Sequence, residues 1–187
     1  MKEALSIVTE VLGALSRSGI PHMMVGSFAR NFHSFPRSTQ DADIVLTLQP
    51  GDLDRLMLEA GPAFALDPQA SFETNTGTFR HTLIHRQSGF TIELFLLSRD
   101  PFDQERFARR LSIQFNGASS SVLTAEDLVL TKLRWARTKD LDDVRDVLAV
   151  QGDGSLNWDY IARWTDVHGT SERLTKIRAA LGPSRPA

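Results

Sequence analysis

The spacing of apolar residues predicts helices and strands in alternation through the first half of the chain. Apolar residues recur every three or four positions over residues 4–16, the spacing of a helix with one buried face. Shorter apolar runs predict strands over residues 20–25, 41–48, 79–85 and 90–97. The last two strands flank Arg86-Gln87-Ser88-Gly89, which is typical of a hairpin turn. Further helices are predicted over residues 26–34, 50–60 and 101–110.

The second half of the chain is predicted to be mostly helical. Two short strands, over residues 111–115 and 120–123, are expected to pair around Asn116-Gly117. Helices follow over residues 125–137, 139–150, 157–167 and 171–181, and the tail at 182–187 is expected to fray. The pattern predicts an α+β fold, a small mixed β-sheet backed by helices. We expect a core at residues 1–123 and a helical C-terminal subdomain at 124–187, packed on the core.

Composition excludes several classes of protein. The 187 residues are 41% hydrophobic and carry a net charge of −2, so neither global disorder nor a strongly basic nucleic-acid surface is indicated. Cysteine is absent from the sequence, which excludes disulfides and thiolate metal sites and fits a reducing cytoplasm. Glu3 and Glu10 interrupt the N-terminal apolar residues, so we expect neither a signal peptide nor a membrane span.

Acidic residues occur where two of the predicted strands should be apolar. Asp41 and Asp43 lead directly into Ile44-Val45-Leu46, and their spacing places both side chains on one face of a strand. Convergent carboxylates of this kind suit Mg²⁺. The alternative is that both acids are solvated or paired with Arg37.

A third acid, Glu93, lies inside the apolar run at 90–97. Alternation places Glu93 on one strand face with Thr91 and Phe95. It is either half of a structural ion pair with an arginine or a third carboxylate beside Asp41 and Asp43.

The Gly26-Ser27 pair ends a predicted strand and begins a predicted helix. Helix N-termini offer unpaired N–H groups and a positive dipole end that attract phosphate. Gly26 would let a phosphate approach the backbone, and Ser27 would add a hydroxyl donor. By itself, such a pair is more often a simple turn or cap.

Together these features resemble the DNA polymerase β-like nucleotidyltransferase superfamily, over residues 20–97. Its motifs are hG[G/S], Dh[D/E]h and h[D/E]h. The matching runs are Val25-Gly26-Ser27, Asp41-Ala42-Asp43-Ile44 and Ile92-Glu93-Leu94. The run from Arg37 to Asp43 is similar to the R-x-T-x-D-x-D form of small bacterial members.

A second resemblance lies further along the chain, at residues 124–132 and 139–144. These segments are similar to a helix pair of stand-alone bacterial nucleotidyltransferases, including the abortive-infection toxin branch. Lys132 matches the lysine of that motif; the alternative is an ordinary surface lysine. The nearby acids are expected to form a solvated helix face; they are Asp140, Asp142, Asp143 and Asp146.

The resemblance implies transfer of a nucleoside monophosphate from an NTP to a hydroxyl acceptor, with two Mg²⁺ ions, or Mn²⁺ in their place. Asp41 and Asp43 would hold the metal ions, and Glu93 would bind the nucleophile-side ion and accept the proton of the hydroxyl. Gly26 and Ser27 would hold the β- and γ-phosphates. Arg37 and Lys132 would orient carboxylates or neutralise phosphate.

The resemblance leaves the acceptor open among an RNA end, a protein and a small molecule. Its toxin branch adds a cognate antitoxin as an expected partner. Two alternatives remain. The chain is a catalytically silent nucleotide-binding or interaction module of the same fold, or its acids are structural and pair with Arg30, Arg37 or Arg80.

Overall fold

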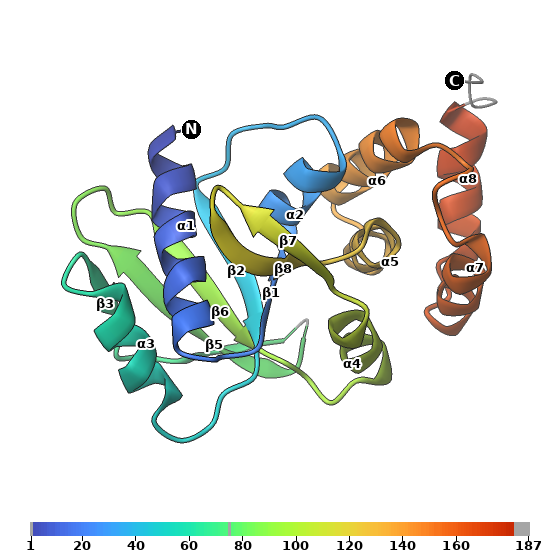
Figure 1. Ribbon diagram of the computed structural model, residues 1–187. Helices are drawn as coiled ribbons and strands as arrows, with labels where there is room; N and C mark the ends of the chain where they lie inside the picture. The colour runs from blue at the N-terminus through green and yellow to red at the C-terminus, as the bar shows by residue number, and fades with distance from the viewer. Residues whose placement is uncertain (1, 75, 182–187) are drawn as a thin grey trace. The chain divides into compact units, whose positions relative to one another are not determined.

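The computed structural model describes residues 2–74 and 76–181, so the predicted fraying of 182–187 lies outside the described residues (Figure 1). The chain divides into two compact units. The first comprises Met1–Phe28 and Ser38–Leu123, and the second comprises Ala29–Arg37 and Thr124–Ala187. No helix in the described ranges is long and apolar enough to cross a lipid bilayer.

Eight strands of the described residues form one sheet in the first unit. Their order is β3-β5-β6-β2-β1-β8-β7, and β4 pairs with β5 at the edge. The strands are β1 (His22–Val25), β2 (Asp41–Leu46), β3 (Phe64–Leu66), β4 (Ser71–Glu73), β5 (Thr78–His85), β6 (Thr91–Leu96), β7 (Leu111–Phe115) and β8 (Ala118–Val122). The sheet is mixed, because β2 runs antiparallel to β1 and parallel to β6. The predicted α+β class is confirmed.

One face of this sheet is the hydrophobic core of the first unit. Alternate residues of its central strands are fully buried; they include Ala42, Ile44, Leu46, Leu83, Ile92 and Leu94. Helix α1 (Lys2–Arg17) contributes Val8, Val11 and Leu12, which are also fully buried, and it packs against β8 and α3 (Asp52–Ala60). Helix α4 (Pro101–Ala108) follows β6. The opposite face is mixed, because it carries Asp43 together with the buried Val25 and Val45.

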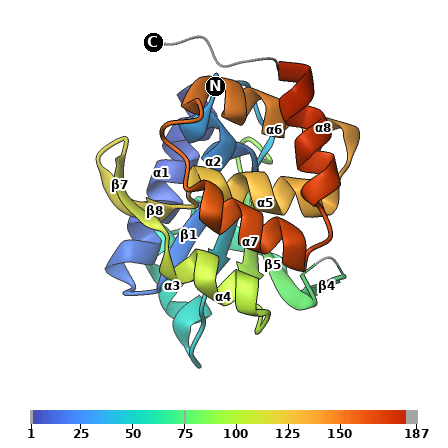
Figure 2. The same cartoon turned by 90° about the vertical axis from the view of Figure 1, so that its right-hand side faces the viewer.

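The second unit is helical. It contains α5 (Ala125–Trp135), α6 (Thr138–Gln151), α7 (Trp158–Val167) and α8 (Ser171–Leu181), shown in Figure 2. Helix α5 packs against α6 and α7, and α8 packs against both α6 and α7. Helix α2 (Gly26–His33) contributes to both units, because the division falls between Phe28 and Ala29.

Two features of the fold differ from the sequence-based expectations. Strands β3 and β4 were not predicted, since each has only three residues and gains its hydrogen bonds from β5. The structure also places residues 29–37 in the helical unit, whereas the predicted core runs unbroken over 1–123.

Candidate active site

The three acids identified in the sequence lie on the same face of the sheet. In the parallel pairing of β2 and β6, Asp41 is opposite Thr91 and Asp43 is opposite Glu93. Residues in register on neighbouring strands share a face, as do residues two apart on one strand. Asp41, Asp43 and Glu93 therefore project from the face opposite the buried core, and each is partly exposed.

The Gly26 turn lies directly against Asp43. Strand β1 pairs with β2 so that Val25 is opposite Asp43, and Gly26 follows with a φ of 60°. A Cβ at position 26 would lie 1.8 Å from Oδ2 of Asp43. Only glycine fits such a position, because both the backbone angle and the close approach exclude a side chain. The sheet thus brings the predicted phosphate turn and one of the acids into contact.

Glu93 is part of an ion pair. Its Oε1 accepts a hydrogen bond from Nη1 of Arg80 at 2.8 Å, and the two side chains are 23% and 27% exposed. The guanidinium carbon of Arg80 also lies 5.8 Å from the ring centroid of Phe95. The structural alternative, a partner arginine for an acid in an apolar strand, is therefore observed for Glu93.

The donor chemistry of this face suits a hard divalent cation, since the acids offer carboxylate oxygens. Asp41 also accepts a hydrogen bond at Oδ1 from the Thr39 hydroxyl, at 3.0 Å. Among residues 2–74 and 76–181, no three His, Cys, Asp or Glu side chains are grouped closely enough to hold a metal ion. The three-carboxylate ligand set of Asp41, Asp43 and Glu93 remains a prediction.

A pocket of about 600 Å³ opens at the starts of β2 and β6. Asp41 and Thr91 line it, together with Glu3 and Ile7 of α1 and Phe90. Its lining is mixed, with carboxylates, hydroxyls and apolar groups. It offers room for a small ligand beside the first of the three acids.

In the second unit, Lys132 is buried rather than on the surface. Its side chain is 5% exposed, and its Nζ lies 2.8 Å from Oδ1 of Asp140 and 3.0 Å from Oδ2 of Asp143. Both acids are fully buried, so the expected solvated face is wrong for these two positions. Burial alone would raise the pKa of Asp140, but hydrogen bonds from Arg137 and Lys132 outweigh it and lower that pKa.

Asp143 also forms ion pairs with two arginines of the segment at 29–37. Nη2 of Arg37 lies 2.7 Å from Oδ1 of Asp143, and Nε of Arg30 lies 3.3 Å from the same oxygen. Arg30 also pairs with Asp146. Arg37 and Lys132 therefore share a carboxylate partner, and their predicted contacts with phosphate remain a prediction.

Sequence reasoning missed this ion cluster, although helical periodicity contains a signal for it. Asp140 lies four residues before Val144 and Asp143 lies four residues before Val147, and both valines are fully buried. Residues at that spacing share one face of a helix. The acids therefore belong to the buried stripe of α6 rather than to its solvent side.

The fold of this chain is that of nucleotidyltransferase-like proteins. A search of solved structures finds an antigenic nucleotidyltransferase-like protein from Paracoccidioides brasiliensis, with a TM-score of 0.61 and 18% identity, covering 100% of this chain and 95% of that one. It also finds JHP933 from Helicobacter pylori, with a TM-score of 0.56 and 18% identity, over 96% and 80% of the two chains.

The antibiotic-resistance factor ANT(2'')-Ia is another structural neighbour. Its solution structure matches with a TM-score of 0.59 and 13% identity, over 96% of this chain and 95% of that one. The same protein is also known in complex with adenylyl-2''-tobramycin. Neither the protein-family comparison nor the comparison with curated proteins finds a match. At these identities the likeness establishes the fold.

Proposed function

We propose that this protein is a metal-dependent nucleotidyltransferase, which moves a nucleoside monophosphate from an NTP to a hydroxyl acceptor. The proposal rests on the register of three neighbouring strands, β1, β2 and β6. Val25, which precedes the Gly26 turn, is opposite Asp43, and Asp43 is opposite Glu93. A turn suited to phosphate and the acids thus lie side by side on one sheet face. The nucleotidyltransferase-like fold of the structural neighbours supports the same conclusion.

In the proposed reaction, the acceptor oxygen forms a bond to the α-phosphorus while the bond from that phosphorus to pyrophosphate breaks. Glu93 takes the proton of the acceptor hydroxyl. The amides that follow Gly26, with the Ser27 hydroxyl, bind the β- and γ-phosphates. Asp41 and Asp43, joined by Glu93, would hold Mg²⁺ or Mn²⁺. When bound, such ions offset the charge that develops on the attacking and leaving oxygens.

Arg37 and Lys132 differ in how accessible their side chains are to a nucleotide phosphate. The Arg37 side chain is 40% exposed, and that of Lys132 is 5% exposed. Arg37 is accordingly the stronger candidate for a phosphate contact. Lys132 would first have to leave two buried carboxylates.

We favour a small molecule as the acceptor. The pocket beside Asp41 has room for one, and ANT(2'')-Ia, a structural neighbour, is known with adenylyl-2''-tobramycin. An RNA end, a protein acceptor and a cognate antitoxin rest on the sequence resemblance alone.

A labelling experiment tests the activity. The purified protein is incubated with each α-labelled NTP, Mg²⁺ or Mn²⁺, and fractionated bacterial lysate, and the label is followed into RNA, protein and small-molecule fractions. We expect transfer from at least one NTP into the small-molecule fraction, and none with Asp43→Ala. Equal labelling by wild type and Asp43→Ala, or none with any NTP, would contradict the proposal.

The competing view, in which the acids serve structure only, gains support from the Arg80–Glu93 ion pair. It predicts that Asp41→Asn with Asp43→Asn lowers the melting temperature. A metal site predicts the opposite in metal-free buffer, where neutralising like charges leaves the melting temperature unchanged or raises it. Melting curves of the double variant with and without Mg²⁺ therefore separate the two views.

A further inference from the structure

Strand β7 forms one edge of the sheet in the first unit. Among residues 2–74 and 76–181, β8 is the only strand that pairs with it, and Figure 2 shows this hairpin at the left of the view. Residues 111–115 include no charge and no proline, and their register with β8 is continuous, without a bulge. Natural edge strands usually carry one of these features, which prevents pairing with another chain. The β7 edge lacks all three.

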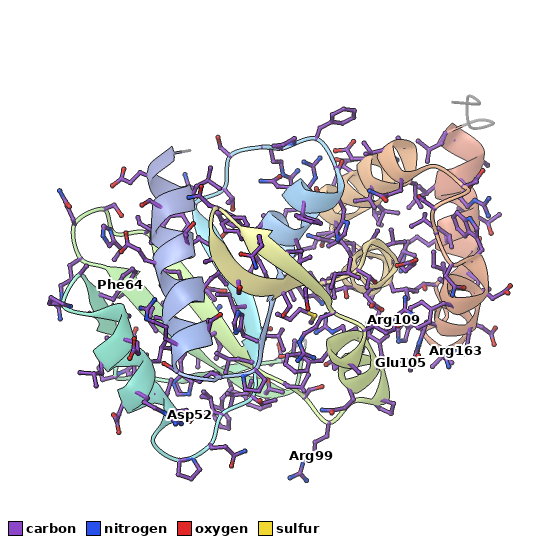
Figure 3. The ribbon with its side chains drawn as sticks, viewed as in Figure 1. Asp52, Phe64, Arg99, Glu105, Arg109 and Arg163 are labelled. Carbon is purple, nitrogen blue, oxygen red and sulfur yellow. The ribbon has the colours of Figure 1, made fainter. Side chains whose placement is uncertain are left out.

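The opposite edge of the sheet is protected. Strands β3 and β4 have only three residues each. Asp67 and Pro68 directly follow β3, and β4 contains Glu73. Phe64 of β3, labelled in Figure 3, is 1% exposed and belongs to the core, whereas Leu111 of β7 is 44% exposed. The sheet is therefore open to further pairing at β7 rather than at β3 and β4.

The backbone of β7 offers hydrogen-bonding groups on its outer side. The two-residue turn Asn116-Gly117, with φ values of 49° and 90°, joins β7 to β8. The residues that flank such a turn form a hydrogen-bonded pair, and bonded pairs alternate with unbonded pairs along an antiparallel ladder. Every second residue back from Phe115 therefore bonds to β8. Ser112 and Gln114, which lie between them, direct their N–H and C=O groups outward, and no backbone bond from another described element reaches them.

A second copy of the same strand fits this edge when the two strands run antiparallel. With a two-fold axis at Ile113, Ser112 of one copy lies opposite Gln114 of the other. Their outward N–H and C=O groups can then bond in both directions. Leu111 lies opposite Phe115 of the second copy, so these two apolar side chains cover each other. The strand is thus complementary to itself, as a two-fold interface requires.

Charges near the strand favour the same orientation. Arg109, labelled in Figure 3, and Arg110 directly precede β7. A parallel pairing would place these arginines of both copies side by side, where they repel each other, and an antiparallel pairing separates them. The arginines of one copy instead lie toward the hairpin tip of the other. At that tip Asn116 Nδ2 is 3.3 Å from Thr9 Oγ1, and the next residue of α1, Glu10, is exposed.

We propose that two copies of this chain associate through β7, so that their two sheets join across a two-fold axis. A second copy is the occupant because the edge matches itself in backbone groups, side chains and charge. An interface limited to one strand edge buries less than the about 1,200 Å² of a stable complex, so the dimer forms reversibly. The inference is independent of the proposed reaction, since β7 carries none of the candidate site residues.

Sedimentation velocity of the full chain tests the proposal. We expect the average mass to rise from 20.8 kDa toward twice that value between about 10 μM and about 1 mM protein. Ser112→Lys with Gln114→Lys places like charges opposite each other and should weaken association by about tenfold. Ser112→Lys with Gln114→Glu places opposite charges there and should associate at least as tightly as wild type.

The matched control adds the same two charges at the opposite edge. Gln69 and Ser71 are exposed and two residues apart, at the start of β4. Gln69→Lys with Ser71→Lys should associate as wild type does. Equal losses of association in this variant and in Ser112→Lys with Gln114→Lys would reveal a general effect of charge and overturn the inference.

Hydrogen exchange of the wild-type chain is a second measurement, which needs no variant. The amides of Ser112 and Gln114 should exchange more slowly at the higher protein concentration, while those of β4 should not change. A chain that stays monomeric, equal exchange of the two amides at both concentrations, or association that the like-charged variant leaves intact would overturn the proposal. Failure of the Ser112→Lys, Gln114→Glu variant to associate would also overturn it.

Discussion

At the scale of single residues, Gly26 shows how closely the backbone approaches a candidate catalytic side chain. It has a positive φ, and a Cβ there would overlap the Asp43 carboxylate. We expect Gly26→Ala to cost more than the about 1–2 kcal/mol of a left-handed residue, because it also displaces Asp43. It should abolish nucleotidyl transfer. Chemical denaturation and the labelling assay measure the two effects.

Gly19 is the matched control for this substitution. Its φ is 67°, close to the 60° of Gly26, but nothing lies within 4 Å of a Cβ built there. Gly19→Ala should therefore cost only the backbone strain and keep full activity. Equal losses of stability and activity in the two variants would show that the contact with Asp43 has no special role.

A second residue-scale prediction concerns His22, which lies in the first unit at the start of β1. Its Nδ1 is 2.9 Å from the Ile20 carbonyl oxygen and its Nε2 is 3.1 Å from the Ser120 hydroxyl. Burial lowers the pKa of His22 below 6.5 and outweighs the Ile20 hydrogen bond, which raises it.

Because the folded state binds the His22 proton less well than the unfolded state, acid destabilises the fold. The stabilisation that neutral His22 contributes to the fold is complete above pH 6.5, the ordinary pKa of histidine. It is lost as the pH falls through the lowered pKa of His22. We expect a lower melting temperature at about pH 5.5 than at about pH 7.5, and a smaller difference in His22→Gln. An unchanged difference in His22→Gln would contradict the prediction.

At the scale of elements, the segment at 29–37 is fixed to α5 and α6 by charge. Asp143 is fully buried and forms ion pairs with Arg30, Arg37 and Lys132. Removing one member of a buried ionic group leaves the others uncompensated. We expect Asp143→Asn to lower the free energy of unfolding by about 3–5 kcal/mol, as measured by urea denaturation.

The neighbouring Asp142 provides the comparison. Its side chain is 56% exposed and pairs with Arg145 one turn away. Asp142→Asn should change stability by less than about 1 kcal/mol, because exposed pairs contribute little. Similar losses of unfolding free energy in Asp143→Asn and Asp142→Asn would contradict the prediction. They would mean that the buried ion cluster stabilises the protein no more than an exposed ion pair does.

Most elements follow from the sequence because each carries its own periodic signal. The run at 41–48 is apolar after its acids, and the observed strand is Asp41–Leu46. Strand β4, in contrast, has only one apolar residue, Phe72, and it exists because its backbone pairs with β5. Strand β4 is held by its backbone pairing with β5 and not by a buried face of its own. Its sequence therefore has no periodic apolar pattern from which the strand could be predicted.

At the scale of the whole molecule, the division of the chain into units predicts how a truncated protein behaves. A chain that ends at residue 123 keeps the segment at 29–37 but loses Asp143 and Asp146, the partners of Arg30. We expect this fragment to melt at a lower temperature than the full chain, by scanning calorimetry. Adding a fragment of residues 124–187 should restore part of the loss.

A fragment of residues 1–123 that carries Arg30→Gln serves as the control, since it has no unpaired charge at that position. It should melt above the unmodified fragment. A fragment as stable as the full chain would instead support the continuous core expected from the sequence.

The sequence alone determined the α+β class and drew attention to Gly26, Asp41, Asp43 and Glu93. Local periodicity encodes strands and helices, and ionisable residues in apolar strands stand out because burying them unpaired is costly. The sequence could not choose between a metal ligand and an ion pair for Glu93.

Only the tertiary structure decided which charges meet. Arg80 reaches Glu93 because two strands pair in one register, and Lys132 meets Asp143 because α5 packs against α6. Strand register and helix packing join residues through space, and no local pattern in the chain specifies those partners.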